Sequence, residues 1–328
     1  MKTKFKHILV ILCLSMISCK GNLEPELFDQ ITPENFLTNE DDVKTAVTGV
    51  YAEFRGISEW GRYKTSWGSV MTLQEVPTDL WAANWFYKAH TDFMWKATDY
   101  FVCEIFEFFV PAITKATALI ARIQDAPVSD DIKNRYIAEL RVARALWMYD
   151  LFDLYGPVPA ITDPEKILNP TQDFTVTRPS REEYITFVET ELKEVINAKI
   201  LPVAWTGSDY GHVSQATAMM VLLQLYMHEG GYCRNKHVGD YLDYFKKAEQ
   251  VAKDIMDLQY YELQAEFKDI WSPQNQFRSS EFSHSGNGKQ LSRPCTTHRL
   301  QVPARHPADR LEWIQNPVGS IRLFRSGR

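Results

Sequence analysis

Apolar residues recur every three or four positions along most of the chain, which is the period of amphipathic helices. The first run carries Val43, Val47 and Val50 and follows a capping-box pattern over 38–41. The next run covers about 102–124 and places a long apolar stripe on one side. This stripe consists of Ile105, Phe108, Phe109, Ala112, Ala116, Leu119, Ile120 and Ile123. Each run predicts a helix with one buried face.

A third helix is expected to begin at Ser129 or Asp130 and to end at Tyr155. Its end is indicated by Gly156, which accepts a left-handed cap, and by Pro157, which cannot continue a helix. Glu139 and Arg144 lie within this run and are interpreted as structural charges that satisfy each other beside the apolar face.

Three more helices follow. A capping box at 180–183 opens the first, and the other two run near 213–229 and 241–258. In the 213–229 helix we expect the buried face to consist of Ala216, Met220, Leu223 and Met227. Successive amphipathic helices with few strand signals predict an all-α array of paired antiparallel helices.

Residues 57–100 interrupt this pattern and form an irregular, aromatic-rich insertion, with five of the nine Trp of the chain. Net charge is −6, so we expect no nucleic-acid partner. The five Cys show no metal-binding spacing, and no catalytic or nucleotide-binding motif is present, so we expect neither a metal nor a cofactor. The carboxylate pairs Glu104/Glu107 and Asp150/Asp153 are interpreted as solvated helix faces, and no enzyme activity is expected.

The N-terminus has the order of a bacterial lipoprotein leader. Basic residues precede an apolar stretch over 8–17, which is too short to span a membrane, and Ser18 then precedes Cys19. We predict a signal peptide over 1–18, lipidation of Cys19, and an extended tether over 19–36.

Four blocks of the chain resemble the SusD/RagB family, in the family's order. They are Cys19 with Leu23, Pro25 and the 36–51 helix; Ala138-Glu139-Leu140-Arg141-Val142-Ala143-Arg144-Ala145 through Tyr155-Gly156-Pro157-Val158-Pro159; Gly211-His212-Val213-Ser214 through Leu225-Tyr226-Met227; and Phe245 to Trp271. The second block is the most specific. The resemblance implies a TPR-like helical fold over 37–281, incomplete with respect to the family.

The same resemblance implies a function. A SusD/RagB protein is expected to be a lipid-anchored outer-membrane protein facing the cell surface. It would hold an oligosaccharide or another nutrient for a TonB-dependent, SusC-like transporter. Two alternatives stay open: a non-catalytic TPR-type scaffold lipoprotein that binds proteins, and a non-functional fragment of a receptor gene.

The aromatic insertion supplies the candidate ligand-binding residues. Indole and phenol rings stack on the apolar face of a pyranose, while amide and carboxylate groups bond its hydroxyls. The candidates are Trp67, Asp79, Trp81, Asn84, Trp85 and Tyr87. For each ring, packing in the core is the competing interpretation.

The end of the chain changes in composition after Glu281. Residues 282–328 carry eight Lys and Arg against two acidic residues, and helical periodicity stops. Because the resemblance ends inside a block, we predict that 282–328 is an unstructured basic tail and the product of a reading-frame change.

The leader generates a first prediction. Labelled palmitate is expected to be incorporated into the wild type and not into Cys19→Ala, because the thiol of Cys19 takes the lipid. The measurement is autoradiography of the immunoprecipitated protein. Equal labelling of the two proteins would contradict the lipid anchor.

Overall fold

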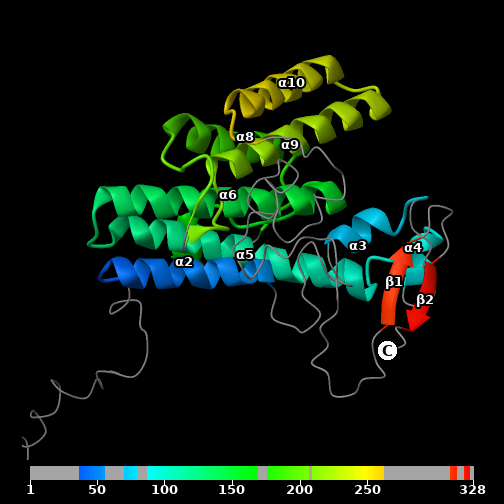
Figure 1. Ribbon diagram of the computed structural model, residues 1–328, viewed down its shortest axis with the longest axis horizontal. Helices are drawn as coiled ribbons and strands as arrows, with labels where there is room; N and C mark the ends of the chain where they lie inside the picture. Colours follow the sequence, from blue (N-terminus) through cyan, green and yellow to red (C-terminus); the bar gives the residue numbers. More distant parts are fainter. Residues whose placement is uncertain are drawn as a thin grey trace, which may run out of the picture.

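The computed structural model describes residues 37–55, 70–79, 87–168, 176–206, 209–261, 311–315 and 321–325. The predicted leader, with Cys19, and the whole of 262–310 lie outside these residues. The described chain is mainly helical, and its long helices are stacked side by side (Figure 1). This confirms the predicted all-α, TPR-like array.

Six long helices build the array: α2 (Glu40–Arg55), α5 (Tyr100–Asp125), α6 (Asp130–Tyr155), α8 (Arg181–Ala198), α9 (Gln215–Lys236) and α10 (Tyr241–Asp257). Three short helices lie in the connections: α3 (Val70–Glu75), α4 (Lys88–Thr91) and α7 (Pro164–Leu168). α2 packs on α5 and α6, α6 on α8 and α9, and α9 on α8 and α10 (Figure 1). No helix of the described residues is both long and apolar enough to cross a bilayer.

Two of the predicted helix ends are confirmed, whereas the helix predicted near 213–229 continues to Lys236 and the residues of the box predicted over 38–41 bond Asp42 instead of Asp41. The Ser180 hydroxyl accepts a hydrogen bond from the backbone N–H of Glu183, and the Glu183 carboxylate accepts one from the Ser180 N–H, which completes the capping box of α8. At the end of α6, Gly156 has φ +71°, a left-handed conformation that favours glycine. These local signals fix where α6 ends and where α8 begins.

The main core forms where the apolar faces of the array meet. The predicted stripe of α5 is buried at every position, from Ile105 to Ile123. The expected face of α9 is wrong: Met227 is exposed and Leu223 is only partly buried, whereas Leu222, Leu225 and Tyr226 are buried. Because α9 contacts helices on several sides and is apolar nearly all around, sequence periodicity does not single out its inner face.

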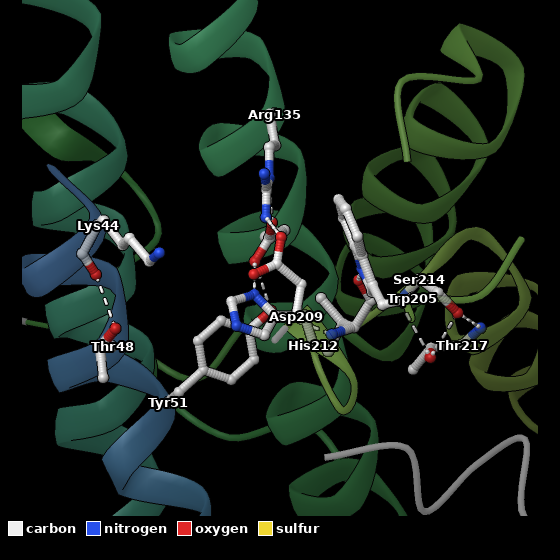
Figure 2. A network of polar contacts seen from close by, with 11 residues as sticks. Lys44, Thr48, Tyr51, Arg135, Trp205, Asp209, His212, Ser214 and Thr217 are labelled. Atoms are coloured by element: carbon white, nitrogen blue, oxygen red, sulfur yellow. Dashed lines mark hydrogen bonds and ion pairs between the residues drawn. The ribbon is translucent and has the colours of Figure 1, made fainter. Parts of the chain in front are cut away.

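A buried carboxylate joins three segments of the array (Figure 2). The side chain of Glu139 on α6 has no exposed surface. Its partners Tyr51, Arg135 and His212 are labelled in Figure 2. It accepts hydrogen bonds from Tyr51 Oη of α2 at 2.8 Å, from Arg135 Nε at 3.0 Å and from His212 Nδ1 at 2.8 Å. Tyr51 Oη in turn accepts the backbone N–H of Val213 at 3.0 Å. Glu139 therefore ties α2, α6 and the segment before α9 together.

Arg135 extends this network toward the 202–214 segment. Its Nη2 lies 2.7 Å from Asp209, and its guanidinium lies 4.3 Å from the ring centre of Trp205. The indole N–H of Trp205 donates to the Val213 carbonyl at 2.8 Å. Ser214 and Thr217 then form the capping box of α9 (Figure 2).

Two further buried ion pairs link neighbouring helices. Arg144 of α6 binds Glu191 of α8, and Arg181 of α8 binds Glu229 of α9. Arg144 also donates to the Thr117 hydroxyl of α5 at 2.9 Å. The structural interpretation of Glu139 and Arg144 is confirmed, although the two residues bind other partners and not each other.

One prediction about acidic residues is wrong, and two short segments of the predicted 282–328 tail are described. Asp150 is fully buried, so it does not lie on a solvated face. Residues Leu311–Gln315 (β1) and Ile321–Arg325 (β2) form an antiparallel hairpin in which Trp313 pairs with Leu323, so these two segments are not unstructured. Each strand has three apolar residues in five, with Trp313 and Ile314 in β1 and Ile321 and Phe324 in β2, and β-branched and aromatic residues of this kind favour strands.

The Glu139 network generates a prediction for stability. Tyr51→Phe removes the donor to Glu139 and leaves the Val213 N–H without its acceptor, so we expect unfolding free energy to fall by about 1–3 kcal/mol in urea. Burial and the Glu139 carboxylate raise the pKa of Tyr51, so the phenol stays protonated and the loss should be constant across neutral pH. Thr48→Ala, on the exposed face of α2, is the matched control. A loss in the control as large as in Tyr51→Phe would contradict the role of the network.

Candidate functional site

The described part of the aromatic insertion centres on α4 and the turn that follows it. The N–H of Phe93 bonds the His90 carbonyl at 3.2 Å, and the N–H of Met94 bonds the Ala89 carbonyl at 2.7 Å. This pair of bonds is the Schellman arrangement that ends many helices. Phe93 occupies the position that glycine usually takes in it.

Phe93 is accordingly held in an unfavourable conformation. Its φ is +57°, in the left-handed region, where a side chain costs roughly 1–2 kcal/mol. Its ring is nevertheless 67% exposed, so burial does not repay this cost. A strained backbone that presents a large apolar side chain to solvent indicates function more than stability.

Trp95 completes an exposed aromatic surface with Phe93. Trp95 is 43% exposed, and its ring centre lies 5.9 Å from that of Phe93. The imidazole of His90 lies 5.9 Å from the indole, with only 11° between the two planes. We call Phe93 and Trp95, with His90 packed against the indole, the aromatic platform.

A small second core supports the platform. Val76, Tyr87 and Phe101 are buried together, and Leu73 packs against them. Phe101 stacks on Tyr87 at 5.0 Å and meets His90 edge-on at 5.9 Å. The first turn of α5 therefore carries the ring on which His90 rests.

His90 is an unusual residue in this position. It is 3% exposed, and among the residues that the structure describes neither ring nitrogen has a hydrogen-bond partner. Burial lowers the pKa of its imidazole, and the nearby Asp99 carboxylate opposes this shift. The ring is thus neutral in neutral solution and packs as an aromatic residue.

Charged groups lie on the same short segment as the exposed rings. Lys88 and Asp92 form an ion pair across one turn of α4, with both side chains exposed. The Asp99 carboxylate accepts the Lys96 N–H at 2.8 Å, which closes the turn before α5. An apolar ring surface bordered by carboxylate and ammonium groups can stack on a sugar ring and bond its hydroxyls.

The sequence-predicted site residues have different outcomes. Tyr87 is buried and stacks on Phe101, so it serves the second core and is not an exposed stacking ring. Asp79 is exposed after α3. The other candidates lie outside the described residues and remain predictions: Trp67, Trp81, Asn84 and Trp85.

Phe93 and Trp95 were not among the binding residues predicted from the sequence, and the structure adds them as candidates. Both were visible as aromatic residues in the irregular insertion. The left-handed conformation of Phe93 was not, because no glycine marks the end of α4. The one signal in the sequence is that the helix ends near Asp92 without a glycine or proline, which indicates that another residue takes the left-handed position.

Other features of the described residues are weaker candidates. A cavity beside α7, lined by Ile161, Asp163, Lys166 and Val176 among others, holds about 110 Å³, well below the roughly 300–1,000 Å³ of ligand sites. Over the described ranges, no group of three His, Cys, Asp or Glu is placed to hold a metal ion. Cys103 and Cys233 are free thiols; Cys233 is buried, whereas Cys103 is only partly so.

The chain and its fold are similar to several known proteins. No family model matches the chain. A SusD-like protein of Bacteroides ovatus is 23% identical over 222 residues, which cover 65% of this chain and 39% of that protein. A solved SusD-like protein of Bacteroides fragilis has a TM-score of 0.59 and 19% identity, over 75% of this chain and 44% of that one.

Two solved neighbours have stated ligands. A laminarin-binding SusD-like protein has a TM-score of 0.59 and 21% identity, over 74% of this chain and 50% of that one. A protein solved with a xylogluco-oligosaccharide has a TM-score of 0.52 and 17% identity, over 71% and 44%. At these identities the structural likeness shows the fold, and the chain spans about half the length of these neighbours or less.

The strain at Phe93 generates a prediction. Phe93→Gly and Phe93→Ala both remove the ring, but only glycine accepts the left-handed conformation without strain. We expect the glycine variant to protect the turn more strongly, by about 1 kcal/mol. Hydrogen exchange of the Met94 amide, which bonds Ala89, measures this local stability. Equal protection in the two variants would show that residue 93 carries no backbone strain.

Proposed function

We propose that this chain, a SusD-like member of the SusD/RagB family, binds oligosaccharide through the aromatic platform and presents it to an outer-membrane transporter. The observation that carries the proposal is the pair of exposed rings, Phe93 and Trp95, one of which is held outward by a strained backbone. The laminarin-binding and xylogluco-oligosaccharide-bound neighbours support the ligand class.

An open surface such as the platform suits an extended sugar chain, whereas a deep pocket would not. Two rings about 6 Å apart at an angle of 45° offer stacking faces along a curved surface, and each face can cover one pyranose ring. Asp92 and Lys88 lie on the same short helix and can bond hydroxyls at the edge of the stacked rings. Binding of this kind needs no catalytic group, and we propose no turnover.

The cellular setting is a further part of the proposal. The lipoprotein leader supports attachment through Cys19 to the outer membrane at the cell surface. The SusD/RagB resemblance supports a TonB-dependent, SusC-like transporter as the partner. Purification of the tagged chain from detergent-solubilised outer membranes, followed by mass spectrometry, tests this partner; recovery without any such transporter would contradict it.

A protein-binding scaffold lipoprotein is the competing function. A scaffold groove is expected to be lined by charged and small residues, whereas a glycan surface is expected to carry aromatic rings. The exposed rings of Phe93, Trp95 and Tyr100 at the start of α5 favour the glycan.

The platform generates a prediction for binding. Trp95→Ala is expected to weaken binding of laminarin or xylogluco-oligosaccharide by roughly two- to twelvefold, because an aromatic contact contributes about 0.5–1.5 kcal/mol beyond area burial. Affinity electrophoresis and calorimetry measure this loss. Met94→Ala is the matched control, since Met94 is exposed on the same turn but has no ring. If the two variants lose affinity equally, the rings do not form the binding surface.

A further inference from the structure

We propose that His90 is a positioning residue that holds the Trp95 indole in its binding orientation only while the imidazole is uncharged, so that the aromatic platform comes apart in mildly acidic solution. The effect on Trp95 concerns this chain's own packing. Its consequence for oligosaccharide release rests on the proposed function.

The first observation is the geometry of packing. The imidazole and indole planes are 11° apart at a centre distance of 5.9 Å, and the edge of His90 meets Phe101 at 65°. His90 therefore lies between the exposed indole and the second core, with 3% of its surface exposed. The orientation of Trp95 depends on the ring that fills this space.

The second observation is the absence of any hydrogen-bond partner for Nδ1 and Nε2 of His90 among the described residues. A phenylalanine would fill the same space without burying polar atoms. A buried, unsatisfied polar group in a protein calls for a physical explanation. A change of protonation explains the histidine, because a neutral imidazole can pack against the indole and Phe101, whereas a charged imidazole would leave this apolar site.

The charges around His90 do not supply a partner for an imidazolium. The second core and the turn bring four segments near His90, and their charged and titratable groups are Glu75 and Asp79 beside Val76, Tyr87, Lys88 and Asp92 in and around α4, Lys96 and Asp99 in the turn, and Tyr100, Cys103 and Glu104 on α5. Lys88 pairs with Asp92, and Tyr100 donates to Glu104 at 2.7 Å. The Asp99 carboxylate, which accepts the Lys96 N–H, is the one whose field favours the charged imidazole.

Acid is expected to lower the stability of the packed arrangement of His90. Burial lowers the pKa of folded His90 below its ordinary value of 6.5. The unpacked state therefore binds a proton at a higher pH than the packed state does. The packed arrangement is fully stable above pH 6.5 and loses stability as pH falls below that value toward the folded pKa.

The first experiment needs no ligand. The full chain is labelled with 5-fluorotryptophan, and the Trp95 resonance is assigned by its loss in Trp95→Phe. Between about pH 8 and pH 5, we expect this resonance to move with one protonation step in the wild type and to stay constant in His90→Phe and His90→Gln. His237→Asn, at the exposed end of α9, is the matched control and should titrate as the wild type does.

The outcomes of this experiment are decisive. A Trp95 resonance that stays constant in the wild type, or one that moves equally in the His90 variants, overturns the proposal. His90→Gln keeps the test valid if His90→Phe fails to fold, because the amide has no proton to gain in this range.

The second experiment measures laminarin binding by affinity electrophoresis at the two ends of the range. We expect the wild type to lose about tenfold in affinity at the acid end, and His90→Phe to lose less than about twofold. Equal losses in the two proteins would overturn the role of His90 in release. A titrating Trp95 resonance in a chain that binds neither laminarin nor xylogluco-oligosaccharide would instead count against the proposed function and leave the positioning role standing.

Discussion

The carboxylate of Glu139 is removed from water entirely, and a charge in that position has to be surrounded by donors. Its donors come from α2, from the preceding turn of α6 and from the segment before α9. Apolar faces alone would allow neighbouring helices to slide or rotate, since their contacts are not directional. A buried carboxylate with three hydrogen-bond donors favours the one arrangement of α2, α6 and the segment before α9 in which all three donors reach it. Arg144 with Glu191 and Arg181 with Glu229 impose the same kind of condition on the next helix pairs.

The aromatic platform stands apart from this network. Its support is the second core of Val76, Tyr87 and Phe101, which touches the main core through Leu73. The strained turn at Phe93 and the imidazole of His90, which has no hydrogen-bond partner among the described residues, therefore lower the stability of a small local unit. The ion pairs of the array stabilise the rest of the described helices. Local units of this kind can open without global unfolding. This separation lets the array stay intact while the turn at Phe93 keeps an unfavourable conformation.

The sequence was sufficient for the parts of the fold that depend on local chemistry. Ser180 with Glu183 and Gly156 with Pro157 mark helix ends through their own hydrogen bonds and dihedral angles. It was insufficient where the answer depends on neighbours: the buried face of α9 is set by the helices around it, and Tyr87 is buried because Phe101 covers it. The partners of Glu139 are 88 and 73 residues away in Tyr51 and His212, a separation that no local pattern encodes.

Residue 93 is a phenylalanine at a position where the backbone conformation favours glycine. Glycine would end α4 at lower cost, and it would leave no surface to bind with. A phenylalanine there carries the conformational cost in the free protein, and the Schellman bonds of Phe93 and Met94 fix the backbone of the turn from which its ring extends. Trp95 is held likewise by contact with His90. On the proposed function, these two rings would bind a sugar chain by stacking, and any ordering of the rings before binding lowers the side-chain entropy that binding costs.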